Sequence, residues 1–274
     1  MGGEHILYTK LAKYYDVIYR EYLKSVVPRE IDAVEEVFRR FARRVVREVL
    51  DIACGTGGPT LELARRGYLV TGADLHEEVI ELARVKAREA GLKVDFVVTD
   101  ARGLSRVFPS DSFDAVTMFF SSINYMTSWG DLLKLLSEVK YVLREGGVFV
   151  ADAPNPHDLM FRLGRGGGEG RAYTWDVEGA EEGEYVVLTD WKEVINWVDG
   201  VIRFKRLITI VRNNGRTESY LMSDTLRLHT AKELELAAKE ADFKEVKVMC
   251  YSKGKLLNPS EGGTCGRLVL VAVK

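Results

Sequence analysis

The sequence predicts an α/β protein with a doubly wound, Rossmann-like sheet of seven strands and an antiparallel β insertion after the fifth strand. Between residues 45 and 153, short apolar runs alternate with amphipathic stretches, which is typical of a parallel sheet with crossover helices. From residue 155 to 230 this rhythm gives way to longer runs rich in β-branched and aromatic residues, which favour antiparallel strands. A chain of 274 residues is long enough for this plan.

The elements of the first half follow from apolar spacing and from the residues that end helices. Two helices are expected before the sheet, because apolar residues recur there near helical spacing. Pro59 suits the start of the next helix, and Gly67 and Gly91 suit the ends of two helices. The expected elements are helices 11–24 and 29–45, strand 48–53, helix 59–67, strand 68–74, helix 77–91 and strand 93–100.

The second half continues the sheet, leaves it for the insertion and returns to it. Asp199-Gly200 and residues 213–215 read as hairpin turns, and Thr230 with Glu233 as a capping box. The expected elements are strand 113–120, helix 131–147, strand 148–154, a flexible glycine-rich linker at 164–171, strands 171–177, 184–198, 201–211 and 218–228, helix 232–241, and strands 243–251 and 267–274. Residues 1–154 and 230–274 are thus expected to form one domain, with 155–229 as the insertion.

Composition narrows the class of function. The chain has 39 basic and 41 acidic side chains, a net charge of −2, so it lacks the positive charge expected of a nucleic-acid binder. Neither a targeting segment nor an apolar run long enough to span a membrane is evident, so we expect a cytoplasmic protein without a membrane partner. The cysteines, Cys54, Cys250 and Cys265, are odd in number and lack a CxxC pair, which predicts reduced thiols and neither a disulfide nor a metal site.

The most informative stretch is DIACGTG, residues 51–57, between the first strand and its helix. Its glycines allow the backbone to turn tightly and to approach a ligand closely. Asp74 ends the second strand and Asp100 the third, so with Asp51 three carboxylates meet at the carboxyl edge of the sheet. Such a crevice accommodates a ligand with an amino group, a ribose and an adenine. The alternative, that all three acids only cap helices, is weaker for three than for one.

Together with GADL (72–75), TDAR (99–102) and REGGVFVAD (144–152), DIACGTG resembles the successive motifs of class I S-adenosylmethionine methyltransferases. The resemblance implies that the methionine part is held by Asp51, Ala53, Gly55 and Gly57. It implies that the ribose and adenine are bound by Asp74, Leu75, Asp100 and Ala101. Ala53 departs from the family, where glycine is commoner, and we expect only a slight shift there.

Two further stretches, KYYDVIY and FFSSINYM, resemble the small-molecule N-methyltransferases that act on amines and amino sugars. The resemblance implies that Tyr15 lies over the cofactor, although a tyrosine packed on the sheet is an equal alternative. Phe119 is expected along the sulfonium, whose charge the face of an aromatic ring stabilises. Asn124 and Tyr125 are expected to face the substrate.

The implied reaction is an in-line methyl transfer to a small-molecule acceptor, most simply an amine nitrogen. Positioning and exclusion of water can supply most of the catalysis, so a general base is optional. His157, just past the fifth strand, is the candidate base, against the alternative that it has no chemical role. His229 is a second histidine that the insertion brings back toward the site, whereas His5 and His76 are expected on the surface.

Other functions stay open. An O-methyltransferase acting on an aromatic or hydroxylated compound and a non-catalytic cofactor-binding partner protein both fit the motifs. A nicotinamide-dependent dehydrogenase is disfavoured, because GxGxxG would need glycine or alanine where Thr60 stands. The insertion is expected to be a substrate lid or the contact of a homodimer. Its aromatic residues suit a pocket wall, a small core or that contact equally; they are Trp175, Tyr185, Trp191 and Trp197.

Overall fold

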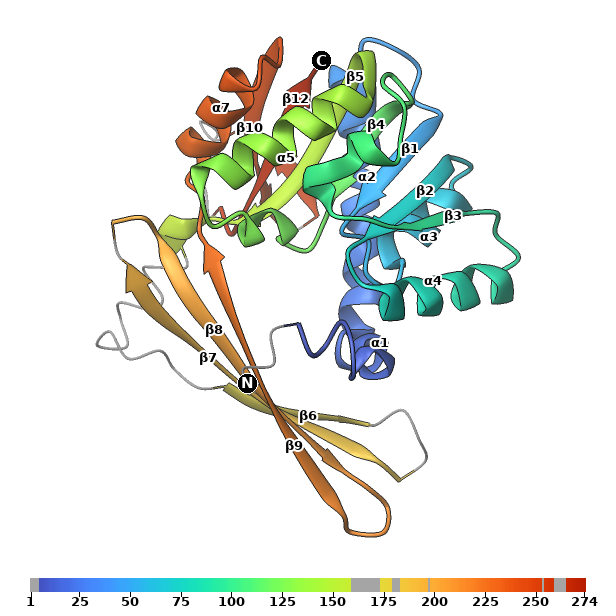
Figure 1. Cartoon of the computed structure of the whole chain (residues 1–274), viewed down its shortest axis with the longest axis vertical. Helices are drawn as coiled ribbons and strands as arrows, with labels where there is room; N and C mark the ends of the chain where they lie inside the picture. Colours follow the sequence, from blue (N-terminus) through green and yellow to red (C-terminus); the bar gives the residue numbers. More distant parts are fainter. Residues whose placement is uncertain (1–4, 159–172, 179–182, 197, 253, 259–264) are drawn as a thin grey trace.

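The computed structural model describes residues 5–158, 173–178, 183–196, 198–252, 254–258 and 265–274 (Figure 1). The N-terminal helical segment and the first half of the sheet comprise η1 (Ala12–Tyr14), α1 (Tyr15–Ile18), η2 (Tyr22–Val26), α2 (Val27–Phe41), β1 (Glu48–Ile52), α3 (Gly58–Arg65), β2 (Leu69–Asp74), α4 (Glu77–Glu89), β3 (Asp95–Val98) and η3 (Ala101–Arg106). The rest comprises β4 (Phe113–Met118), η4 (Ser122–Tyr125), α5 (Trp129–Val142), β5 (Leu143–Pro154), β6 (Tyr173–Glu178), β7 (Tyr185–Asn196), β8 (Val201–Val211), β9 (Thr217–Arg227), α7 (Ala231–Glu240), β10 (Glu245–Ser252), β11 (Lys255–Leu257) and β12 (Arg267–Val273).

The main sheet has eight strands in the order β11-β10-β12-β5-β4-β1-β2-β3. The strands from β3 to β5 are parallel, and β12 runs antiparallel beside β5. The Rossmann-like architecture predicted from sequence is confirmed, but the count of seven strands was wrong. The extra strand, β11, pairs with the end of β10 and has 3 residues, too few to show a hydrophobic period.

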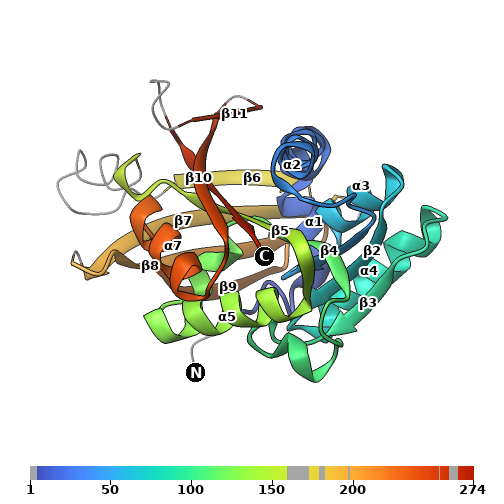
Figure 2. The ribbon, with the colours of Figure 1, turned by 90° about the horizontal axis from the view of Figure 1, so that it is seen from above.

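Helices cover both faces of this sheet (Figures 1 and 2). On β5, Phe149 and Ala151 belong to the apolar cluster formed with α5 and α7, whereas Val148 and Val150 belong to the cluster formed with α2 and α3. Burial on both faces explains why β4 and β5 read as continuous apolar runs. The capping box predicted at the start of α7 is present, with Thr230 and Glu233 bonded to each other's backbone N–H.

The insertion forms a separate antiparallel sheet in the order β6-β7-β8-β9. Its inner face packs on the N-terminal segment in a cluster that includes Leu11, Tyr14, Leu188 and Ile208. Figure 1 shows α1 between this sheet and the rest of the molecule. The N-terminal segment is therefore enclosed between the second sheet and the main sheet, and its first expected helix, 11–24, is broken into the short pieces η1, α1 and η2.

Two cysteines depart from the sequence expectation. Cys250 and Cys265 form a disulfide with their Cα atoms 5.5 Å apart, so the prediction of reduced thiols is wrong for this pair. Strand pairing of β10 with β12 brings Cys250 opposite Leu268, close to the start of β12, which linear spacing does not reveal. Cys54 stays a buried free thiol. In the described part of the chain no helix is long and apolar enough to cross a membrane, and no cluster of His, Cys, Asp or Glu suits a metal ion.

Candidate functional site

A cavity of about 210 Å³ lies at the carboxyl ends of β1 to β4, beneath the N-terminal segment. Seven of the ten residues predicted to bind the cofactor line it: Tyr15, Ala53, Gly55, Asp74, Leu75, Asp100 and Ala101. Parallel strands place these separate motifs side by side because their carboxyl ends meet at one edge of the sheet. The structure thus gathers most of the sequence-predicted set around one opening.

The loop after β1 shapes the floor of this cavity through left-handed backbone conformations. Ala53, Gly55 and Gly57 have φ angles of 53°, 54° and 78°. A left-handed alanine is strained by roughly 1 kcal/mol, and such strain is commonly kept at functional sites. Gly57 does not line the cavity; a Cβ added there would lie 3.2 Å from Cβ of Ala83 on α4. Gly57 thus lies against α4, and its predicted contact with the methionine part stays a prediction.

Asp74 provides hydrogen-bond acceptors on one side of the cavity. Its Oδ2 accepts the backbone N–H of Gly55 at 2.8 Å, and its Oδ1 accepts the backbone N–H of His76 at 3.0 Å. The N–H of the glycine loop is thus directed at a carboxylate within the protein and is not offered to a phosphate. Oδ1 also lies 3.3 Å from the ring Nδ1 of His76, whereas Oδ2 still has a lone pair for a ligand donor, so this edge suits hydroxyl and amino groups.

Asp100 stands on the other side of the opening and is held by Arg102. The backbone N–H of Arg102 donates to Asp100 Oδ1 at 2.8 Å, and its guanidinium donates to both carboxylate oxygens. Arg102 lowers the pKa of the Asp100 carboxyl through these hydrogen bonds and its charge. Asp100 is therefore ionised near neutral pH.

Asp51 and Phe119 lie apart from the main cavity. They line a neighbouring cavity of about 20 Å³ on the far side of the glycine loop. Asp51 is 1% exposed and accepts from Thr60 Oγ1 at 2.6 Å and from Thr117 Oγ1 at 2.9 Å. Burial raises the pKa of its carboxyl to about 7 despite these two hydrogen bonds.

Several residues that line the cavity were not predicted from the sequence. Phe120, the neighbour of the predicted Phe119, lines the main cavity and has a φ of 61° at the end of β4. A two-residue alternation cannot foresee this change of face, because a left-handed residue breaks the strand geometry. His5 and His76 were expected on the surface, which was wrong: both line the cavity, and their ring centroids are 5.2 Å apart. Tyr8 stacks on His76 and lines it as well.

Of the other side chains predicted to act on the substrate, one lines the cavity and the rest lie outside its wall. Tyr125 lines the cavity, whereas Asn124 is buried beside it and does not. His157 is exposed, and its backbone N–H donates to Asn155; it is not part of the cavity wall. His229 is fully buried outside the wall, and burial lowers the pKa of its imidazole to about 4. Neither histidine is placed to act as a base in this cavity.

Three candidates in the insertion lie wholly or partly outside the described residues. Nothing is described of the Trp175 side chain, of Trp197 or of the glycine-rich segment 164–171. Trp191 is half-buried and Tyr185 is 50% exposed. The alternatives of pocket wall, small core and dimer contact therefore stay open for these aromatic residues.

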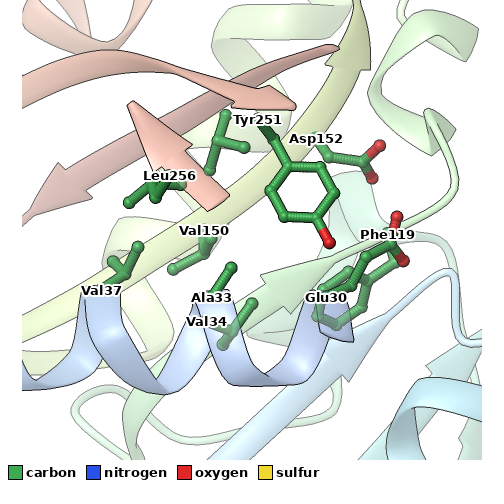
Figure 3. Close-up of a pocket in the computed structure, with 10 residues that line it drawn as sticks. Glu30, Ala33, Val34, Val37, Phe119, Val150, Asp152, Tyr251 and Leu256 are labelled. Atoms are coloured by element: carbon green, nitrogen blue, oxygen red, sulfur yellow. The ribbon is translucent and has the colours of Figure 1, made fainter. Parts of the chain in front are cut away.

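A third cavity, under α2, is too small for a substrate (Figure 3). Figure 3 shows Glu30, Asp152 and the Tyr251 hydroxyl on one side and aliphatic residues on the other. Its volume of about 20 Å³ suits about one water molecule. Asp152 is already paired with Arg267, so this cavity does not compete with the larger one as a ligand site.

Comparisons with known proteins agree with this geometry. Residues 49–147 match the family model described as a methyltransferase domain. A demethylmenaquinone methyltransferase of Thermus thermophilus is 40% identical over 120 residues, which is 43% of this chain and 52% of that protein. The sequence resemblance is confirmed: this part of the chain is a class I methyltransferase domain. The chain spans about half the length of the curated relatives it matches.

Solved structures extend the likeness to the whole fold. The sugar N-methyltransferase of Streptoalloteichus sp. has a TM-score of 0.74 at 23% identity, over 95% of this chain and 92% of that chain. The amino pentose methyltransferase of Micromonospora echinaspora, solved with S-adenosylmethionine bound, has a TM-score of 0.70 at 22% identity, over 94% of this chain and 95% of that chain. The fold, including the second sheet, is thus that of Rossmann-like methyltransferases.

Proposed function

From the premise that residues 49–147 are a methyltransferase domain, we propose that the chain binds S-adenosylmethionine in the 210 Å³ cavity and methylates a small molecule at an amine nitrogen. The observation that carries this proposal is the wall of that cavity. It combines the carboxylates Asp74 and Asp100 with apolar Leu75 and Ala101 and with a backbone loop at Gly55.

The residues present fit this cofactor better than a dinucleotide. An adenosyl group offers hydroxyl and amino donors, which Asp74 and Asp100 can accept. A pyrophosphate would need N–H donors or cations at the glycine loop. There, the Gly55 N–H is already bonded to Asp74 and is not offered to a phosphate.

The roles of the chain's own residues follow from their positions. Asp74 would hold the ribose hydroxyls, Leu75 and Ala101 would contact the adenine, and Asp100 would accept from its amino group. Asp51, below the loop, would attract the ammonium of the methionine part. When bound, the cofactor supplies a methyl group on a sulfonium, activated for in-line displacement. Tyr15 and Phe120 border the cavity with aromatic rings, which favour a positive charge and exclude water.

We propose an amine as the acceptor and name two alternatives to it. The solved neighbours described as sugar N-methyltransferase and amino pentose methyltransferase support an amine. The relative described as a ubiquinone biosynthesis O-methyltransferase keeps open the alternative of an O-methyltransferase that acts on an aromatic or hydroxylated compound. The third reading, a cofactor-binding protein without transfer activity, predicts binding but no turnover. Whether the second sheet also joins two copies stays a prediction.

Calorimetry with purified protein tests the proposal. We expect S-adenosylmethionine and S-adenosylhomocysteine to bind at one site, and Asp74→Ala to weaken both by at least about tenfold, because the ribose loses its acceptor. The matched control is Asp242→Asn, at an exposed carboxylate outside the cavity. No heat with either nucleoside, or unchanged affinity in Asp74→Ala, would overturn it. Transfer of a labelled methyl group to amines, and not to phenols, would then identify the acceptor class.

A further inference from the structure

We propose that Asp224, acting through Tyr125 and Tyr8, makes the cavity select a methyl acceptor with an ammonium group over one with an alcohol or a carboxylate. The acceptor end of the cavity is the part that Tyr8 and Tyr125 line. This inference rests on the proposed function, since it concerns the acceptor of the same site. It assigns a role to a strand of the second sheet, β9, which contributes no residue to the cofactor motifs.

Asp224 is a buried carboxylate with little to balance its charge. It is 3% exposed, and it faces the N-terminal segment from the same side of the sheet as Met222 and Arg206. Its Oδ2 accepts from the hydroxyl of Tyr125 at 3.0 Å, and its Oδ1 has no hydrogen-bond partner. Within the described residues it forms no ion pair, because Arg206 is engaged with Asp190 at 2.6 Å.

Burial of an unpaired carboxylate lowers the stability of the folded protein, and a positive group close to it would offset this cost. The described side chains supply none. A cationic ligand in the neighbouring cavity would supply it. The two tyrosines that connect Asp224 to that cavity, Tyr125 and Tyr8, both line it.

The direction of the hydrogen bonds decides what the cavity can bind. Tyr125 uses its only proton toward the carboxylate, so in the 3.2 Å contact between the two hydroxyls Tyr8 must be the donor. Both phenol oxygens are then left with lone pairs alone. Burial raises the pKa of Tyr8 and of Tyr125, and Asp224 contributes to both shifts, so the two phenols keep their protons.

An ammonium group matches this arrangement because it has three donors and no acceptor. A carboxylate has no proton to offer and is repelled by Asp224, and an alcohol offers one donor without charge. The bound ammonium must first lose one proton to water, because only the free amine has a lone pair that can take the methyl group. The methylated nitrogen is again positively charged, so the same chain of hydrogen bonds also favours the product. Asp224 touches the ligand only through the tyrosines and is therefore a positioning residue.

The test uses the full chain saturated with S-adenosylhomocysteine, so that no turnover occurs, and three probes of one shape: cyclohexylamine, cyclohexanol and cyclohexanecarboxylate. We expect calorimetry at neutral pH to show cyclohexylamine binding at least about tenfold more tightly than either other probe. Asp224→Asn and Tyr125→Phe should each remove this preference. Asp224 does not line the cavity, so Asp224→Asn should leave the affinity for S-adenosylhomocysteine within about twofold. Tyr220→Phe, on the same strand but outside the cavity, is the matched control and should keep the preference.

The outcomes separate this inference from the proposed function. If the protein does not bind S-adenosylhomocysteine, the proposed function fails. If it does, equal affinities for the three probes, no binding of cyclohexylamine, or an unchanged preference in Tyr125→Phe would each overturn the role of Asp224. If Asp224→Asn does not fold, Tyr125→Phe alone decides, because it removes the link and keeps the ring.

Discussion

Asp51 is a buried carboxyl group whose ionisation is opposed by its surroundings. Two threonine hydroxyls stabilise its charge, yet burial still raises the pKa of its carboxyl from 3.8 to about 7. In the free protein its ionisation is therefore unfavourable at neutral pH. A cationic ammonium nearby would reverse that penalty, which couples the charge of Asp51 to cofactor binding.

We expect Asp51→Asn to change the pH dependence of stability in a defined direction. Between pH 3.8 and about 7 the folded state binds more protons than the unfolded chain, so ionisation costs stability as the pH rises through this window. The variant does not titrate. The free energy of unfolding of the variant minus that of the wild type should therefore rise by about 1.4 kcal/mol per pH unit from pH 5 to 7. Above pH 7 this difference should stay constant.

Urea unfolding of the cofactor-free protein at pH 5, 6, 7 and 8 measures this difference. Asp242→Asn serves as the control, because the pKa of that exposed carboxyl is lowered by Lys140 and its window lies below this range. A difference between wild type and Asp51→Asn that does not change with pH would contradict the raised pKa. The same variant should bind S-adenosylmethionine more weakly.

At the scale of elements, the contact of α3 with α4 depends on a single glycine. Gly57 caps α3 with a left-handed backbone, and α4 approaches so closely that an added Cβ would lie 3.2 Å from Ala83 and 3.4 Å from Phe96. The glycine loop and the helix pair are therefore one packed unit. Its geometry holds Ala53 and Gly55 at the cavity.

We expect Gly57→Ala to lower the free energy of unfolding by about 2–3 kcal/mol, since backbone strain and overpacking add. Gly67→Ala is the matched control: its φ is 93°, and a Cβ there would meet nothing within 4 Å. It should cost only the strain, about 1 kcal/mol. Thermal unfolding of both variants measures the difference, and equal losses would show that packing on α4 contributes nothing.

At the scale of the whole molecule, the site depends on segments far apart in the chain. The N-terminal segment supplies His5, Tyr8 and Tyr15 to a cavity whose floor comes from the strand ends. The second sheet packs on that segment from the other side and carries Asp224. The main sheet and the N-terminal segment thus supply the cavity wall, and the second sheet supplies the carboxylate behind Tyr125.

The disulfide between Cys250 and Cys265 predicts the thiol reactivity and the stability of the whole molecule. With an intact bridge, the denatured protein should present a single alkylatable thiol, that of Cys54, and two more after reduction. The bridge closes a loop of 15 residues, so Cys265→Ser should lower the free energy of unfolding by about 3 kcal/mol. Reducing agent should lower the melting temperature of the wild type and leave that of the variant unchanged. Three thiols alkylated without reduction would contradict the bridge.

The sequence by itself determined the architecture and located most of the residues that line the cavity at the strand ends. Apolar periodicity located the strands of both sheets except β11, because the burial of one or both faces of a strand sets the pattern of apolar residues along it. The glycines at 55 and 57 and the acids at 74 and 100 were found for the same reason: each stands at the end of an element, where local rules apply.

Only the tertiary structure decided which side chains meet across distant segments. The turn of Phe120 into the cavity, the approach of His5 to His76, the pairing of Cys250 with Cys265 and the chain from Tyr8 to Asp224 all join residues without a shared local pattern. Their proximity results from strand order, left-handed residues and packing of the second sheet on the N-terminal segment. These contacts depend on the whole fold, because the residues that form them are too far apart in the sequence for a local pattern to predict them.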